Sequence, residues 1–263
     1  MDHMIDAFGR FMAARGAVQA MGWRAGACRA LRRVAVVRKI RCVVGAVTDH
    51  GERVYTVELK PSTAVTQFKP GQFLHLALDA FEPGGFWPES RVFSIASSPR
   101  ERDRLAITYA VKGAFSTRME HELAPGRSVW VKLPYGEFVV DPGTDAVLFA
   151  GGTGVTAFTA FLQSLEPDQA SRVLLFYGAR KPNLFVYGPL AEACAHDVPS
   201  LACKLVCEGT DGPLQVAAAW PAIEALHNPV FYLSGPPQML IALTKQLREY
   251  GVTSDDIRTD AWE

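Results

Sequence analysis

A turn rich in glycine follows a strongly apolar segment in the second half of the chain, and turns of this kind can bind phosphates. The turn consists of Gly151, Gly152, Thr153 and Gly154. Together with Ala157, Gly152 and Gly154 fit the dinucleotide pattern Gly-x-Gly-x-x-Ala, in which glycines clear space for a pyrophosphate at a helix N-terminus. Its position between a predicted strand and a predicted helix favours a dinucleotide site over a tight turn without a ligand.

A second turn, made of Ser234, Gly235 and Pro236, also lies between a predicted strand and a predicted helix. The apolar segments before the two turns are typical of buried parallel strands. Because ligands bind at the carboxyl ends of parallel strands, we expect both turns to face one site.

The first half of the chain carries a cation, an aromatic ring and a hydroxyl on one predicted strand. The segment reads Arg91, Val92, Phe93 and Ser94. Strand alternation puts Arg91 and Phe93 on one face and Ser94 on the other. Taken alone, the segment fits an ordinary strand with an exposed arginine and a buried phenylalanine.

Gly113, Ser116 and Thr117 lie at the start of a predicted helix further along the chain. A glycine lets the backbone approach a phosphate, and the hydroxyls can bond to it. The helix is expected to begin near Ser116, because 117–120 has a capping-box pattern, and to stop before Pro125. Its free N–H groups suit an anion.

The surrounding pattern predicts a two-domain protein. Short runs rich in Val, Tyr, Phe and Thr indicate an antiparallel β-barrel, with strands at 41–47, 53–59, 73–78, 91–96, 105–111 and 129–133. Apolar strands that alternate with helices indicate an α/β unit with a parallel, Rossmann-like sheet. Its strands are expected at 146–150, 172–177, 202–208 and 229–233, and its helices near 154–165, 186–196, 214–226 and 237–249. The predicted divisions are an N-terminal extension at 1–37, a barrel domain at 38–141 and a nucleotide-binding α/β domain at 142–263.

Composition limits the classes of function. The 263 residues include 27 Lys and Arg and 27 Asp and Glu, so no positive surplus draws the chain to nucleic acid. No apolar run approaches the ~20 residues that a membrane helix needs. The five cysteines and the lack of a secretory leader predict a cytoplasmic protein, and neither cysteine nor histidine spacing predicts a metal site.

The basic N-terminal extension has no acidic residue between Ala7 and Thr48. An organelle-targeting peptide, a membrane-surface helix and a loosely ordered extension all fit this pattern. Residues 1–40 contain no serine, which weakens the targeting hypothesis, and we favour the loosely ordered extension.

In this order, the segments at 91–94, 113–117, 151–154 and 234–236 resemble the motifs of the ferredoxin–NADP reductase superfamily. The resemblance covers roughly residues 38 to 263. It implies a flavin-binding barrel followed by a pyridine-nucleotide domain.

On the flavin side, the resemblance implies that Arg91 pairs with a flavin phosphate and that Phe93 packs against the isoalloxazine or the ribityl chain. Ser94, next to Val92 and Phe93 in the flavin-binding strand, is implied to bond near flavin N5 as a catalytic residue. The residues implied to hold the pyrophosphate are Gly113, Ser116 and Thr117.

On the nicotinamide side, the residues implied to cradle the dinucleotide are Gly151, Gly152, Thr153 and Gly154. Ser234, a second catalytic candidate, is implied to line the place where nicotinamide C4 meets flavin N5, together with Gly235 and Pro236. Trp262 resembles the aromatic residue that ends many family members and could stack on the flavin, and a frayed terminal residue is the alternative.

Two positions depart from the family pattern: Phe93 replaces the usual tyrosine, and Ser234 replaces the usual cysteine. The first change removes a hydroxyl that would bond to the flavin. The chain has no Cys-x₄-Cys-x₂-Cys set, so any iron–sulfur centre belongs to a partner. FAD is favoured over FMN, because the arginine strand and the separate glycine turn together suit a pyrophosphate.

The resemblance implies a reductase that passes hydride from NADH or NADPH to FAD, and then electrons to a protein acceptor such as ferredoxin, flavodoxin or an oxygenase component. The alternative is a non-catalytic flavin- or nucleotide-binding electron-transfer subunit or sensor of a larger complex. Glu208 is expected to end a central strand, where it could accept the ribose 2′-hydroxyl of NADH. Arg180 and Lys181 favour NADPH instead, and we lean towards NADH.

Overall fold

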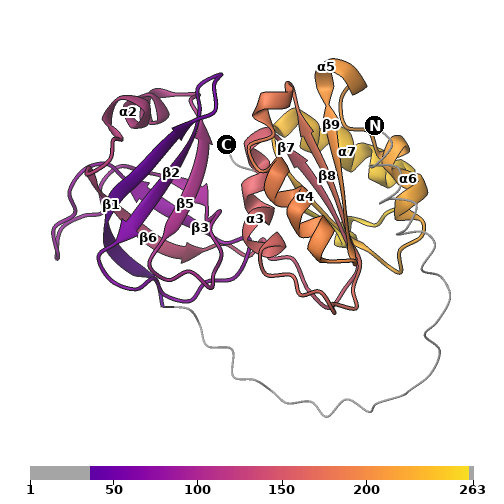
Figure 1. The fold of residues 1–263 in the computed structure, drawn as a ribbon, viewed down its shortest axis with the longest axis horizontal. Helices are drawn as coiled ribbons and strands as arrows, with labels where there is room; N and C mark the ends of the chain where they lie inside the picture. The colour runs from indigo at the N-terminus through magenta and orange to yellow at the C-terminus, as the bar shows by residue number, and fades with distance from the viewer. Residues whose placement is uncertain (1–35, 261–263) are drawn as a thin grey trace, which may run out of the picture.

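The computed structural model describes residues 36–260, which form a β-barrel and an α/β unit that lie side by side (Figure 1). Almost all of the predicted N-terminal extension lies outside the described residues, and so does Trp262. Among the described residues, no helix has the length and apolar character needed to cross a membrane.

Six antiparallel strands form the barrel, in the order β4-β3-β6-β1-β2-β5. They are β1 (Arg38–Asp49), β2 (Val54–Pro61), β3 (Phe73–Ala77), β4 (Ser90–Ser94), β5 (Leu105–Ala110) and β6 (Ser128–Tyr135). β4 and β5 are the two ends of this order, and just beyond β4 the N–H of Ala96 donates to the carbonyl of Ala106 at 2.8 Å. The barrel is therefore nearly closed, with its gap between β4 and β5.

Strand alternation fills the inside of the barrel. Leu74 and Leu76 on β3 are fully buried, as are Val129 and Val131 on the neighbouring β6. The helix α2 (Ala114–Glu122) adds two buried residues, Phe115 and Met119, to the same core. Burial of each large apolar side chain stabilises the fold by about 1.5–3 kcal/mol, so this core holds β4 and β5 on either side of the gap.

The α/β unit is built on a five-stranded parallel sheet in the order β11-β10-β7-β8-β9. The strands are β7 (Ala146–Gly151), β8 (Val173–Ala179), β9 (Leu201–Cys207), β10 (Val230–Ser234) and β11 (Ile257–Asp260). The first strand of this sheet along the chain is β7, in its centre. β8 and β9 follow on one side of β7, and β10 and β11 follow on the other side. The strand order therefore reverses between β7 and β10, which is where ligands bind in such sheets.

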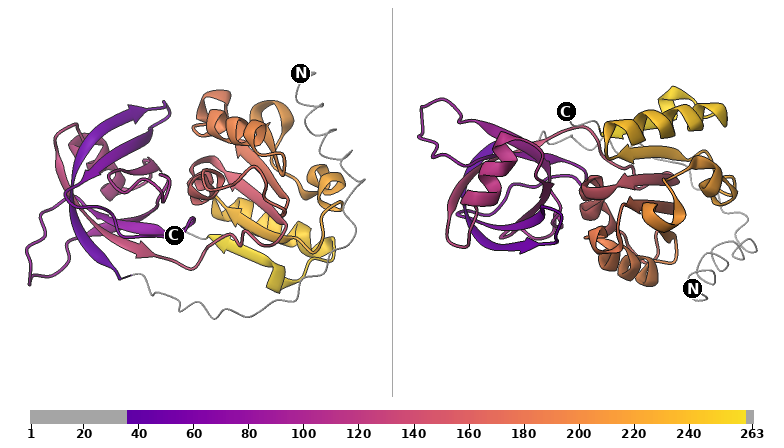
Figure 2. Two further views of the ribbon diagram at one scale, coloured as in Figure 1. Left: turned by 60° about the horizontal axis from the view of Figure 1, so that its bottom comes forward. Right: turned by 90° about the horizontal axis from the view of Figure 1, so that it is seen from above.

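Helices cover both faces of this sheet (Figure 2). The first face carries α3 (Thr156–Leu162) and α4 (Gly188–Asp197), and the second carries α6 (Val216–Ile223) and α7 (Pro237–Glu249). The remaining helical segments are short: η1 (Gly152–Val155), η2 (Pro182–Leu184), α5 (Glu208–Asp211) and η3 (Ser254–Asp256). Buried apolar side chains on both faces explain why the sequence shows continuous apolar runs rather than alternation here.

The predicted two-part fold class is confirmed, but three local expectations were wrong. Helix α2 begins at Ala114 after the N-cap Gly113, two residues earlier than expected. The predicted capping box at 117–120 does not form, because Thr117 lies inside the helix and Ser116 instead accepts a hydrogen bond from the N–H of the N-cap Gly113. Glu120 accepts hydrogen bonds from Arg53 and Tyr55 of the barrel. The strand β11 was also missed, since its sequence Ile-Arg-Thr-Asp lacks the apolar signal of the other parallel strands.

Helix α3 is hydrogen-bonded to the barrel segment that follows β4. Thr159 Oγ1 donates to the carbonyl of Ala96 at 2.9 Å, and Gln163 Nε2 donates to the same oxygen at 3.0 Å. Thr159 is fully buried. Because Ala96 lies two residues after Ser94, these bonds hold the end of β4 against the helix that follows the glycine turn.

Replacing Thr159 with valine tests this connection. Thr159→Val keeps the shape but removes the hydroxyl donor, so we expect the free energy of unfolding in urea to fall by about 1 kcal/mol. Ser164→Ala is the control, because the Ser164 hydroxyl donates only to the carbonyl of Ala160 in its own helical segment. If the free energy of unfolding falls no more in Thr159→Val than in Ser164→Ala, the hydrogen bond between Thr159 and Ala96 does not stabilise the contact between α3 and the barrel.

Candidate active site

A cleft of about 870 Å³ lies between the barrel and the α/β unit. The barrel contributes β4 and β5, and the α/β unit contributes the turns that follow β7 and β10. The predicted site residues that line the cleft are Val92, Phe93, Ser94, Gly151, Gly152, Thr153, Gly154, Glu208, Ser234, Gly235 and Pro236. The structure thus brings together three segments that are far apart in the sequence.

The remaining predicted residues lie outside the lining of this cleft. Gly113, Ser116 and Thr117 are at the start of α2, and the guanidinium of Arg91 lies 5.2 Å from the centroid of the Phe115 ring of that helix. Arg91 is exposed and also pairs with Glu89 at 3.2 Å. These residues form a separate group beside the barrel gap, and Trp262 lies outside the described residues.

The Ser116 hydroxyl is already engaged within its own turn. Its oxygen accepts hydrogen bonds from the N–H groups of Lys112 at 2.9 Å and Gly113 at 3.1 Å, and it donates to the carbonyl of Gly113 at 3.0 Å. The Ser116 hydroxyl is therefore not free to bind a ligand. The exposed side chain of Lys112, in the same turn, lines the cleft.

The turns at 151–154 and 234–236 lie in direct contact. A Cβ atom at Gly154 would lie 2.4 Å from the carbonyl oxygen of Ser234, so only glycine allows this approach. Gly152 has a φ of +52° and no atom within 4 Å of where its Cβ would be, which leaves its side of the turn open. The cleft therefore has a tight base at Gly154 and an open wall at Gly152.

The Ser234 side chain is hydrogen-bonded to an acidic residue on the neighbouring strand β11. Ser234 is only 1% exposed, and its Oγ donates to Asp260 Oδ2 at 3.1 Å. Asp260 is the residue paired with Ser234 across β10 and β11, and it is also buried. The bond fixes the orientation of the Ser234 hydroxyl at the edge of the cleft. Asp260 was not among the predicted site residues, because the strand that carries it was not predicted.

The barrel wall contributes a second residue that the sequence analysis missed. Tyr109 on β5 lines the cleft, and its ring centroid lies 6.1 Å from that of Phe93. Burial raises the pKa of Tyr109 above its ordinary value, so its hydroxyl is protonated at neutral pH. Its neighbour Thr108 also lines the cleft and is hydrogen-bonded at 2.8 Å to the hydroxyl of Tyr187, which precedes α4. The barrel and the α/β unit are thus joined at the cleft itself.

The far end of the cleft carries charges of both signs. Glu208 and Arg180 line it, and both are exposed. Glu208 opens α5 after β9, which is an edge strand, so the expected central position was wrong. Lys181 does not line the cleft, because it pairs with Glu52 of the barrel at 2.7 Å, and this hydrogen bond lowers the pKa of Glu52. Only one of the two predicted cations therefore reaches this end.

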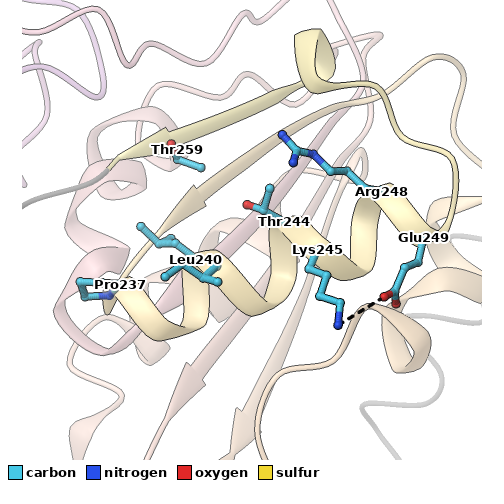
Figure 3. A pocket seen from close by; sticks show the side chains of 8 residues that line it. Pro237, Leu240, Thr244, Lys245, Arg248, Glu249 and Thr259 are labelled. Carbon is cyan, nitrogen blue, oxygen red and sulfur yellow. Dashed lines mark ion pairs between the residues drawn. The ribbon is translucent and has the colours of Figure 1, made fainter.

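A second hollow lies along α7 beside β11 and contains none of the predicted site residues (Figure 3). It is lined by Leu240 and Ile241 and by an ion pair of 3.8 Å between Lys245 and Glu249. The described residues include no group of three or more His, Cys, Asp or Glu side chains that could hold a metal ion. The interdomain cleft is therefore the candidate site.

Comparisons with known proteins give relatives of one type, although no protein-family model matches the chain. The ferredoxin reductase component of 3-ketosteroid-9-alpha-monooxygenase from Mycolicibacterium smegmatis is 27% identical over 227 residues, which cover 84% of this chain and 64% of that protein. Ferredoxin–NADP reductase B from Sorangium cellulosum is 36% identical over 133 residues, which cover 49% of this chain and 52% of that protein. The chain thus matches between half and two thirds of the length of these relatives.

Solved structures agree in fold. The crystal structure of a cytochrome P450 reductase from Amycolatopsis superposes with a TM-score of 0.73 at 22% sequence identity, covering 86% of this chain and 70% of that chain. The two relatives are named as ferredoxin reductases, and the solved structures share the two-part fold, which together confirm the resemblance inferred from the four motifs.

The contact between the two turns generates a stability prediction. Gly154→Ala places a methyl group against the backbone of Ser234, so we expect it to lower the free energy of unfolding by about 1–3 kcal/mol. Gly113→Ala is the matched control, because Gly113 has an extended φ of −151° and no atom within 4 Å of its added Cβ. Equal unfolding free energies of the two variants, measured in urea, would show that the turns are not in close contact.

Proposed function

We propose that the chain is a flavin-dependent reductase that accepts hydride from NADH or NADPH on FAD and passes electrons to a protein acceptor such as ferredoxin, flavodoxin or an oxygenase component. The observation that carries this proposal is the meeting of Phe93 and Ser94 with the turns at 151–154 and 234–236 in one cleft. The names of the two relatives support it, because one is the ferredoxin reductase component of a monooxygenase and the other is a ferredoxin–NADP reductase.

The barrel side of the cleft fits a flavin. Phe93 offers an aromatic wall and Ser94 a hydroxyl. Arg91 and Lys112 supply positive charge beside the gap, where a pyrophosphate would lie, and this favours FAD over FMN. Bound FAD would take up a hydride and release electrons singly or in pairs. The proposal assigns this role to the domain at 38–141.

The α/β side fits a nicotinamide dinucleotide, and the proposal assigns this role to the domain at 142–263. The open side of Gly152 and the N–H groups at the start of η1 suit the pyrophosphate. Ser234, fixed by Asp260, would set the position of the nicotinamide ring opposite Ser94. Because a well-oriented pair of reactants at short distance lowers the barrier to transfer, the role of these residues is positioning and exclusion of water.

The proposal also places the protein in the cytoplasm. Four described cysteines, Cys42, Cys194, Cys203 and Cys207, are free. Burial raises the pKa of the thiols of Cys42 and Cys203 to about 12, so they would remain protonated and unreactive. Free thiols of this kind suit a reducing compartment.

Anaerobic titration of the purified, FAD-loaded protein tests the proposed function. We expect one equivalent of NADH or NADPH to bleach the visible flavin absorption, because the cleft would deliver the nicotinamide to the flavin. The control is the same titration with the flavin alone in buffer. A protein that binds FAD but is inert to both nicotinamides would favour the alternative, a non-catalytic electron-transfer subunit or sensor.

The charges at the far end of the cleft predict the choice of donor. Glu208 would accept the ribose 2′-hydroxyl of NADH and repel the 2′-phosphate of NADPH, with Arg180 opposing it. We expect a preference for NADH, and we expect Glu208→Gln to lower the ratio of kcat/KM for NADH to that for NADPH about tenfold, or roughly 1.4 kcal/mol. Glu249→Gln on α7, away from the cleft, is the control. An unchanged ratio in Glu208→Gln would remove this residue from donor selection.

A further inference from the structure

Apolar side chains of both units meet along one side of the cleft. Val54 of β2 packs with Ala179 of β8 and Leu184 of η2, and these three side chains are buried. All three line the cleft, and so does Ala110 of β5, which packs against them. The hydrophobic effect has no preferred direction, so this contact joins the two units without fixing how they are oriented.

Tyr187, which lies between η2 and α4, adds a directional contact on the same side. Its hydroxyl is hydrogen-bonded at 2.8 Å to Thr108 Oγ1 of β5, and Thr108 is buried at the lining of the cleft. Thr108 Oγ1 is also hydrogen-bonded at 2.8 Å to Thr56 Oγ1 of β2. Burial raises the pKa of Tyr187 above its ordinary value, so the hydroxyl keeps its proton at neutral pH. One residue of the α/β unit is therefore bonded, through two threonine hydroxyls, to two strands of the barrel.

Two other polar contacts between the units on this side lie at the surface. Lys181 Nζ donates to Glu52 Oε1 at 2.7 Å, and Asn183 Nδ2 donates to the carbonyl of His50 at 3.2 Å. Both contacts are exposed, and exposed polar contacts contribute little to holding two elements in place. The part-buried bond of Tyr187 therefore has more influence on the spacing of the two units than these surface contacts.

The two units are thus connected on each side of the gap in the barrel. On the β4 side, Thr159 of α3 bonds to the segment that follows Phe93 and Ser94, and on the β5 side Tyr187 bonds to Thr108. Two separated points of attachment restrict rotation of one unit against the other, which a single point would allow. The bond of Tyr187 therefore contributes to the distance across the cleft.

We infer that Tyr187 is a positioning residue for hydride transfer, whose bond to Thr108 holds the barrel wall of the cleft at a fixed distance from the turns at 151–154 and 234–236. The inference rests on the proposed function, in which two electrons and a proton pass as hydride from nicotinamide C4 to flavin N5. This transfer needs the two atoms about 3–3.5 Å apart, and a displacement of about 1 Å can slow it about 100-fold. Because each unit would bind its own ligand, a looser junction would slow the transfer and leave the binding of each ligand nearly unchanged.

The variant Tyr187→Phe tests this inference, because it keeps the ring and removes the hydroxyl. When the FAD-loaded protein is mixed with NADH in an anaerobic stopped-flow experiment, we expect the rate constant of flavin reduction at saturating NADH to fall about tenfold. The dissociation constants for FAD, from fluorescence titration of the flavin-free protein, and for NADH are expected to stay within about twofold of the original values. Weaker binding of either ligand in place of a slower transfer would assign Tyr187 to binding and overturn the inference.

Thr108→Val tests whether the bond itself carries the effect. We expect Tyr187→Phe, added to Thr108→Val, to slow flavin reduction no further, because the bond is already lost. The melting temperature of the flavin-free protein gives a readout without ligands: Tyr187→Phe is expected to lower it in the original protein and to leave it unchanged in Thr108→Val. If Tyr187→Phe slows flavin reduction equally in both backgrounds, the bond to Thr108 is not the cause and the inference is overturned.

Tyr177→Phe is the matched control. Tyr177 is fully buried in the α/β unit, and its hydroxyl donates to the carbonyl of Leu184 at 3.3 Å within that unit. We expect this variant to lower the melting temperature and to leave the rate constant of flavin reduction within about twofold of the original value. If it slows flavin reduction as much as Tyr187→Phe does, the loss reflects general destabilisation and overturns the inference.

Failure of this inference and failure of the proposed function give different results. If neither NADH nor NADPH reduces the FAD-loaded original protein, both are overturned. If the original protein is reduced and Tyr187→Phe is reduced at the same rate, the inference is overturned and the proposed function stands.

Discussion

The close approach of two backbone turns at Gly154 is the constraint on which the rest of the site depends. The turn after β7 reaches the carbonyl of Ser234 only because Gly154 has no side chain, and this approach occurs where the order of the parallel strands reverses. It sets the base of the cleft and places Ser234 at its edge, where Asp260 holds the hydroxyl in one orientation. A larger side chain at this point would separate β7 from β10, whose turns line the cleft.

The barrel side depends on a different feature, the gap between β4 and β5. The barrel closes by a backbone hydrogen bond just beyond β4, and α3 is tied to the same segment through Thr159. The helix that follows the glycine turn is therefore connected to the strand that carries Phe93 and Ser94. Because the cleft is formed at this junction, a ligand held by the barrel and one held by the α/β unit would meet without any large movement of the two bodies.

Local sequence signals predicted the fold and much of the cleft. Glycine turns after apolar strands can be recognised in a sequence, because steric demand restricts them to few residue types. The strand at 91–94 was predicted as part of the site because of the motifs that precede and follow it along the chain. Asp260 was missed because β11 is short and polar, and Tyr109 because a tyrosine in a β-strand has an ordinary role in a core. The edge position of β9 and the pairing of Glu120 with Arg53 depend on contacts between distant segments. The spacing of residues along the chain does not predict contacts between distant segments.

We propose that a flavin and a nicotinamide meet between Ser94 and Ser234. The decisive measurement is a crystal structure of the protein with both FAD and oxidised nicotinamide dinucleotide. We expect the isoalloxazine ring against Phe93 and nicotinamide C4 about 3–3.5 Å from flavin N5, the separation suited to reaction. A flavin bound away from β4 and β5, or a nicotinamide bound outside the cleft, would contradict it.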